Sequence, residues 1–138
     1  MPNYQGVWSL STQYQAKGDG NWPANYVAPV GLFAGGRSTT GANSQLNTIQ
    51  KLDLLSSGNT SDFGDLAVAT QAIAASSSST RAIYGGGSQL STGTTNTISY
   101  VEIPTSGNAT DFGDLTQARY GLYGCSSDTR GIFAGGEN

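Results

Sequence analysis

Residues 96–115 of the chain, NTISYVEIPTSGNATDFGDL, repeat the earlier segment NTIQKLDLLSSGNTSDFGDL at residues 47–66. Eleven of the twenty positions are identical at an offset of 49 residues. The match extends downstream, because RAIYGGG at 81–87 aligns with RGIFAGG at 130–136, and GLFAGG at 31–36 is an earlier copy of that element. Self-similarity at a fixed period of this length predicts a fold built from repeated supersecondary units.

The residues of each unit predict short strands joined by turns. Apolar positions within 31–36 and 47–54 fit strands that are packed on both faces. The Ser-Gly-Asn and Asp-Phe-Gly-Asp segments that follow are typical of turns, since Gly, Asn and Asp favour turn conformations. Two more strands are then expected in each unit, at 66–70 and 71–77 in the first and at 115–119 and 120–126 in the second.

Four short strands in a period of about 50 residues favour the blade of a kelch-like β-propeller. We expect an all-β fold with a repeat domain at 31–138, made of units at 31–80 and 81–129 and an extra strand at 130–138. Phe63 and Phe112 are expected to pack between neighbouring blades. Paired glycines allow positive φ or close backbone approach in the crowded inner strands; these are Gly35, Gly36, Gly86 and Gly87.

The number of blades points to self-association. A propeller needs about four to eight blades to close, whereas this sequence holds two and an extra strand. Sheet edges left open in this way are templates for pairing with another chain. Copies are therefore expected to complete each other's blades in a ring or to stack head to tail. The expected interface is the C-terminal strand, with Arg130, Gly131, Ile132, Phe133, Ala134, Gly135 and Gly136.

The N-terminal segment, residues 1–30, lies outside the repeat. Apolar positions at Val7, Leu10 and Tyr14 predict one short helix, which the glycines and polar residues of 17–21 would end. The segment is interpreted as a cap over the sheet edge or as a docking or oligomerisation element, and the residues favour neither.

Composition and charge argue against several classes of protein. The net charge is -3 and the six basic residues are scattered, so nucleic acid is not an expected partner. No apolar run is long enough to insert into a membrane, and the first residues lack the basic and apolar regions of a signal peptide. The chain has no His, which excludes His-dependent triads and the usual zinc ligands. We therefore expect no enzyme and no bound cofactor.

Acidic residues recur at equivalent positions of the two repeats. Carboxylate pairs are typical of acid–base catalysis, but a duplicated position is more often structural. Asn59-x-x-Asp62-x-x-Asp65 and its repeat also offer oxygen ligands for Ca²⁺, although the spacing matches no EF-hand loop. Turn capping is the favoured interpretation, with Ca²⁺ as the alternative, for Asp62, Asp65, Asp111 and Asp114.

A few other side chains carry a functional alternative. Arg81 and Arg130 precede equivalent strands, and each is expected to pair with an acid of a neighbouring blade rather than with a ligand. The single Cys125 excludes an intrachain disulfide, and its apolar, small-residue strand predicts a buried side chain. Core packing is favoured over stacking on sugars for three tyrosines, Tyr100, Tyr120 and Tyr123.

The pattern GIFAGG, NTI-x-Y-V-x-I, TSGNATDFGDLT-x-AR and GLYGCSSDTRGIFAGG resembles kelch-like repeats in virion proteins of tailed phages, notably those of marine cyanobacteria. GVWSLSTQYQAKGDGNWP, residues 6–23, resembles a segment of the same tail-fibre proteins. The resemblance covers nearly the whole chain. It implies a non-enzymatic structural protein of the virion, of tail-fibre or appendage type, whose repeats display the loops 37–46 and 88–95.

The partners implied by the resemblance are further copies of the chain, other virion proteins, and a host-surface glycan or protein. Two alternatives stay open. One is a protein that only assembles into a filament or ring, and the other is a soluble, lectin-like module that binds glycans.

Overall fold

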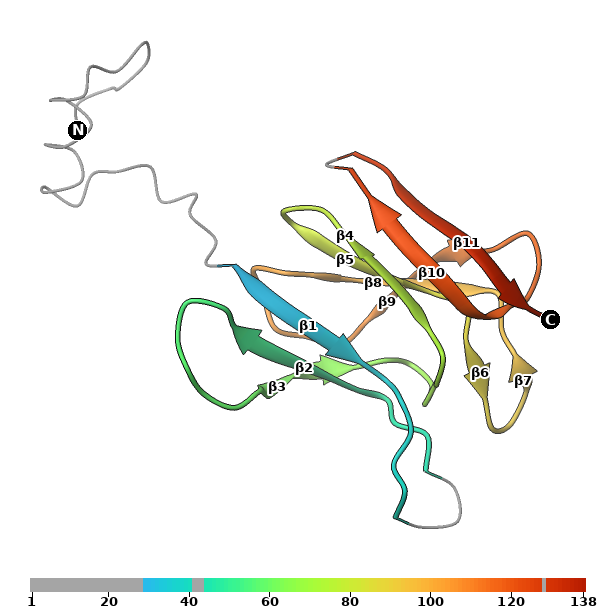
Figure 1. Cartoon of the computed structure of the whole chain (residues 1–138), viewed down its shortest axis with the longest axis horizontal. Coiled ribbons are helices and arrows are strands. Elements are labelled where there is room, and N and C mark those ends of the chain that lie inside the picture. The colour runs from blue at the N-terminus through green and yellow to red at the C-terminus, as the bar shows by residue number, and fades with distance from the viewer. Residues whose placement is uncertain (1–28, 41–43, 128) are drawn as a thin grey trace, which may run out of the picture.

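A computed structural model describes residues 29–40, 44–127 and 129–138, and every regular element within them is a β-strand. The all-β prediction is therefore confirmed. The strands form three antiparallel sheets that follow one another along the chain, and a small hairpin that is inserted between two strands of the second sheet (Figure 1). The short helix expected before residue 17 lies outside the described residues.

We call the three sheets the first, central and last sheet. The first sheet has the order β1-β2-β3, with β1 at Val30–Ala34, β2 at Thr48–Asp53 and β3 at Ser61–Asp65. The central sheet has the order β4-β5-β8-β9, with β4 at Ala74–Ser77, β5 at Arg81–Gly85, β8 at Thr97–Glu102 and β9 at Thr110–Asp114. The last sheet pairs β10 at Tyr120–Ser126 with β11 at Gly131–Glu137. The hairpin joins β6 at Ser88–Gln89 to β7 at Gly93–Thr94.

The strands predicted at 66–70 and 115–119 are wrong, because both segments form loops. The Asp-Phe-Gly-Asp segments predicted as turns are instead the edge strands β3 and β9. Edge strands tolerate charged side chains, since one edge of the backbone faces solvent. A register shift in the partner strand, between Ile49 and Gln50 in β2 and between Ile98 and Ser99 in β8, accommodates the irregular pairing.

The main hydrophobic core lies between the first and central sheets. Phe63 and Ile49 of the first sheet are 3% and 0% exposed, and they share one cluster with Ala82, Tyr84 and Val101 of the central sheet. Burying side chains of this size stabilises the fold by about 1.5–3 kcal/mol each. The core is therefore formed between two sheets, and it holds the first sheet against the central sheet.

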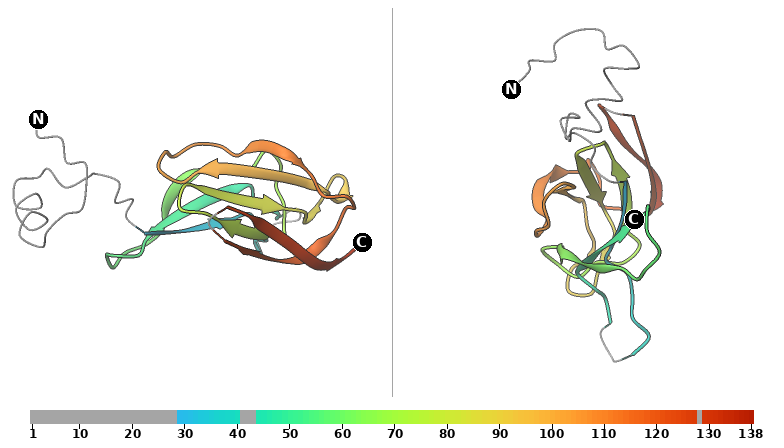
Figure 2. Two further views of the ribbon diagram at one scale, coloured as in Figure 1. Left: turned by 90° about the horizontal axis from the view of Figure 1, so that it is seen from above. Right: turned by 90° about the vertical axis from the view of Figure 1, so that its left-hand side faces the viewer.

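The central and last sheets meet at two glycines. Gly124 of β10 lies against the carbonyl of Ala75 in β4, so a side chain there would collide with the backbone. Phe133 of β11 lies over Gly85 of β5. Figure 2 shows that β10 and β11 form one outer edge of the molecule.

Candidate functional site

The repeats of the sequence assign a counterpart to each strand. At the offset of 49 residues β8 corresponds to β2, β9 to β3, β10 to β4 and β11 to β5. At an offset of 51 residues β1 also corresponds to β5. By this assignment the central sheet holds all four strands of a unit. The first sheet lacks a counterpart of β4, and the last sheet lacks counterparts of β8 and β9.

These differences leave β1 and β11 each with one unpaired edge at a place where β5 is paired on both sides. Strand β5 pairs with β4 on one side and with β8 on the other. Its counterpart β11 pairs with β10 alone, and its counterpart β1 pairs with β2 alone. An unpaired edge offers a row of backbone donors and acceptors. The two open edges are complementary. Strand β11 lacks a neighbour equivalent to β8, which β1 has in β2, and β1 lacks a neighbour equivalent to β4, which β11 has in β10.

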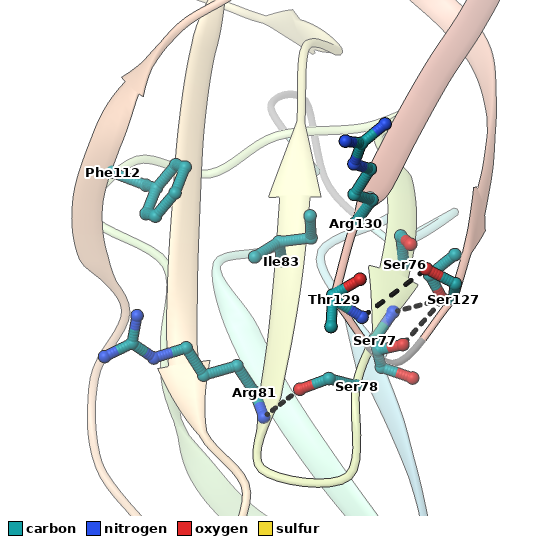
Figure 3. A pocket seen from close by; sticks show the side chains of 11 residues that line it. Ser76, Ser77, Ser78, Arg81, Ile83, Phe112, Ser127, Thr129 and Arg130 are labelled. Atoms are coloured by element: carbon teal, nitrogen blue, oxygen red, sulfur yellow. Dashed lines mark hydrogen bonds between the residues drawn. The ribbon is translucent and has the colours of Figure 1, made fainter.

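A hollow of about 180 Å³ lies beside the open edge of β11 (Figure 3). We call it the Phe112 hollow, because the ring of Phe112 on β9 forms one wall and Ile83 and Gly131 form others. Hydroxyl side chains from β4, from β10 and from the turns that follow these strands, together with Arg81 and Arg130, complete its lining. The hollow is thus apolar toward the central sheet and polar at its rim.

The two arginines of the rim differ in their partners. Arg81 donates from Nε to Glu102 on the neighbouring strand β8 at 2.7 Å, and its guanidinium lies 4.6 Å from the ring centre of Tyr100. The pair lies within one sheet, so the prediction of an acid on a neighbouring blade is wrong for Arg81. Arg130 is exposed and forms no ion pair among the described residues.

The two equivalent phenylalanines lie in different surroundings. Phe63 is buried against the central sheet, whereas Phe112 is 59% exposed at the hollow. The ring of Phe112 contacts only Tyr100 among the aromatic residues described, edge to face at 6.0 Å. Phe112 therefore occupies the position of a core residue without the sheet that would cover it.

The first glycine of each pair makes a close approach at two of the three repeats. Gly35 and Gly86 have φ of 64° and 65°, and each lies against a loop carbonyl, that of Thr70 or that of Arg119. Their neighbours Gly36 and Gly87 donate to the same carbonyl oxygens at 2.9 and 2.8 Å. The equivalent Gly135 has φ 76°, and nothing lies where its side chain would be.

The buried Tyr84 carries a polar group without a partner. Its hydroxyl forms no hydrogen bond with any described residue. Burial raises the pKa of Tyr84 to about 12, because the charged phenolate would lose its hydration there. By contrast, the Tyr120 hydroxyl donates to the Glu137 carboxylate at 2.8 Å, and this hydrogen bond raises the pKa of Tyr120.

Two predictions of burial in β10 are wrong. Cys125 is exposed, and Tyr123 is 83% exposed. The physical reason is that β10 belongs to a sheet of only two strands, so one face of it meets no other element among the described residues. Tyr100 and Tyr120 are half-buried.

The repeated acids do not converge on one point. Within the described part of the chain, no three His, Cys, Asp or Glu side chains are placed to hold a metal ion. The Asn of the second motif has a structural role, because Asn108 Oδ1 accepts a hydrogen bond from the Asp65 backbone at 3.0 Å. Asp111 accepts a local hydrogen bond from the Gly113 backbone at 3.3 Å.

Sequence reasoning missed the polar contacts that join the sheets. Ser76 Oγ donates to the Cys125 carbonyl at 3.0 Å, and Ser126 Oγ donates to the Ser77 carbonyl at 2.6 Å. Each pair is separated by 49 residues. A signal was present for the second contact alone, since Ser77 and Ser126 are the same residue at equivalent places of the two repeats.

None of the described residues forms a helix that would be long and apolar enough to cross a membrane. In comparisons with protein-family models and with curated proteins, nothing matched this chain.

Proposed function

We propose that this chain is a non-enzymatic structural protein of tail-fibre or virion-appendage type, which self-assembles through kelch-like β-blades. The observation that carries the proposal is the pair of complementary open edges on β1 and β11. Long unpaired edges are normally shielded in proteins that stay monomeric. Each of these two edges lacks the neighbouring strand that the other has, and this favours assembly of identical chains.

The order of strands supports a propeller blade as the building unit. The central sheet runs β4-β5-β8-β9 with antiparallel neighbours throughout, as the blades of propellers do. Its inner strand β4 lies beside β10, the inner strand of the next unit, where Gly124 meets the Ala75 carbonyl. Close packing of inner strands near an axis requires such small residues.

The loops of the repeat support a display role. The β6–β7 hairpin and the described part of the β1–β2 connection project from the same side of the molecule (Figure 1). Leu90 in the hairpin is 62% exposed and borders, with Val68, a hollow of about 270 Å³. Exposed apolar side chains gathered at loops favour contact with another surface, here a host-surface glycan or protein, or another virion protein.

Light scattering with negative-stain microscopy tests the assembly directly. We expect oligomers or polymers of the 14.2 kDa chain at micromolar concentration. A monomer at every concentration would contradict the proposal. Binding to glycan arrays and to whole cells, compared between the wild type and Leu90→Asn, tests the display role. Assembly without any such binding would leave a protein that only builds filaments or rings.

A further inference from the structure

We infer that β11 of one chain pairs with β2 of a second copy, in the place that β1 occupies within a single chain. The inference rests on the proposed self-assembly and specifies its interface. The shared sheet would have the order β10-β11-β2-β3, with the last two strands from the second copy. This is the order of the complete central sheet β4-β5-β8-β9, strand for strand.

The sequence of the two competing strands supports the exchange. Residues 31–36 read GLFAGG and residues 131–136 read GIFAGG, so five of six positions are identical. In the single chain Gly31 lies opposite Leu52 and Leu32 lies opposite Lys51. In the same register β11 places Gly131 opposite Leu52 of the second copy and Ile132 opposite Lys51. Each residue of 31–34 that lies opposite β2 then has an identical or similar residue in β11.

Charge favours β11 over β1 at the end of that register. In the central sheet Arg81 lies opposite Glu102 and forms an ion pair with it. In the first sheet the corresponding position opposite Asp53 holds Val30. The exposed Arg130 corresponds to Arg81, so β11 brings an arginine opposite Asp53 of the second copy. The strand from the second chain thus supplies the charge that the strand of the same chain lacks.

The Phe112 hollow supplies an independent argument from packing. Phe63 is buried because Ala82 and Val101, which lie opposite each other in the central sheet, cover it. The equivalents around Phe112 are Gly131, already present in the wall of the hollow, and Leu52 of the second copy. Leu with Gly has the same number of side-chain carbons as Val with Ala. The arriving strand therefore fills the hollow and buries the exposed ring.

The loops before β3 and β9 give a third argument. Asp65 accepts a hydrogen bond from Ala109 N at 2.8 Å, and Gly64 lies against the backbone of Gly107. The equivalent Gly113 on the central sheet has open space beside it. The segment that corresponds to residues 107–109 is residues 58–60, which is exposed, with open space beside Gly58. A second copy in the inferred position places these two uncovered surfaces against each other.

The decisive experiment locks β1 onto β2. In a Cys125→Ser background, Leu32→Cys and Lys51→Cys place two cysteines opposite each other, at a separation that a disulfide spans. We expect the oxidised protein to be monomeric and the same protein to assemble once dithiothreitol is added. Since one protein is its own control, a folding defect would show in both states by circular dichroism.

Two outcomes separate the inference from the function on which it rests. If the wild type assembles and the oxidised variant assembles equally well, β1 is not displaced and the exchange is wrong, while self-assembly stands. If the wild type never assembles, the proposed function fails as well.

A mixture of two single-cysteine proteins tests the register. Ile132→Cys in one protein and Lys51→Cys in the other, both with Cys125→Ser, should form a disulfide between chains on oxidation. Replacing Lys51→Cys by Gln50→Cys moves the thiol to the other face of β2, so that the yield should fall at least several-fold. Equal yields from both mixtures would contradict the register.

Charge reversal provides a readout without cysteines. Arg130→Glu should weaken assembly several-fold, as expected for an exposed ion pair, and adding Asp53→Arg should restore it. Asp53→Arg alone is the matched single variant, because it leaves two arginines opposite each other in the inferred register and should weaken assembly as Arg130→Glu does. Failure of Asp53→Arg to restore assembly would contradict the pairing of these two residues.

Discussion

The hydroxyl of Ser126 donates a hydrogen bond to the carbonyl oxygen of Ser77, its own counterpart one repeat earlier, at 2.6 Å. The backbone N–H of Ser77 points back to the same hydroxyl at 3.4 Å. Equivalent residues of the two repeats therefore form hydrogen bonds with each other. In β4 and β10 small polar side chains carry the contact between sheets, which lets the two backbones approach more closely than an apolar layer would.

Replacing Ser126→Ala should weaken the attachment of the last sheet. The hydroxyl serves Ser77 with one donor and one acceptor, and a typical hydrogen bond contributes about 0.5–1.5 kcal/mol. We expect the free energy of unfolding in urea to fall by about 1 kcal/mol. Ser77→Ala is the matched control, because the Ser77 hydroxyl has no hydrogen bond among the described residues and only its backbone is used. A larger loss from Ser77→Ala would contradict this account.

Gly124→Ala should separate β10 from β4. The added methyl group would meet the Ala75 carbonyl, so the backbone must shift, at a cost of about 1–3 kcal/mol. Gly58→Ala is a matched control, because nothing lies within 4 Å of its added carbon. Urea unfolding should find Gly124→Ala strongly destabilised and Gly58→Ala unchanged or slightly stabilised. Similar effects from both would show that β4 and β10 are farther apart than described.

The equivalent substitutions Phe63→Ala and Phe112→Ala should differ sharply in the isolated chain. Phe63 is 3% exposed, and its loss should cost about 3–5 kcal/mol. Phe112 is 59% exposed, and its loss should cost less than about 1 kcal/mol under dilute conditions. At concentrations where chains associate, Phe112→Ala should weaken assembly while Phe112→Leu retains most of it. An equal cost for both substitutions in the monomer would be inconsistent with the difference in burial.

Tyr84 makes stability depend on alkaline pH. Its pKa rises from 10.0 to about 12 on folding, so the folded state holds the proton more tightly. The corresponding stability is complete below pH 10, declines as the pH rises from 10 to 12, and amounts to about 2–3 kcal/mol. Tyr84→Phe should remove this decline and, because an unpartnered hydroxyl is lost, raise stability near pH 7 by about 1 kcal/mol.

Urea unfolding between pH 7 and 12 checks the role of Tyr84. Tyr123→Phe is the control, since that side chain is 83% exposed and the variant should follow the wild type. If the free energy of unfolding of Tyr84→Phe still declines at alkaline pH as in the wild type, the decline belongs to other groups.

The repeat in the sequence predicts the all-β class and the strands at 31–36 and 47–54, because glycine pairs and alternating apolar residues carry a local signal. It fails at Asp62-Phe63-Gly64-Asp65, where residue preferences favour a turn. Tertiary packing decides that segment, since Phe63 enters the core and draws its neighbours into an edge strand.

The candidate site was only partly predictable for a related reason. The strand 130–136 was identified from its repeat, because an unmatched copy of a strand implies a missing neighbour. The exposure of the two equivalent phenylalanines could not be predicted from the repeat. Phe63 and Phe112 stand in nearly identical sequence, but Phe63 packs on the four-stranded central sheet, whereas the last sheet has only two strands and leaves Phe112 exposed.

The complete central sheet has a numerical consequence for any closed ring. With strands exchanged as inferred, each chain supplies the whole central sheet and half of a shared sheet at either end. One whole sheet and two halves make two blades per chain. Rings of two, three or four chains then span the range of about four to eight blades that propellers use, and the number of blades is always even. Five- and seven-bladed rings are excluded by this symmetry, whatever the concentration of the chain.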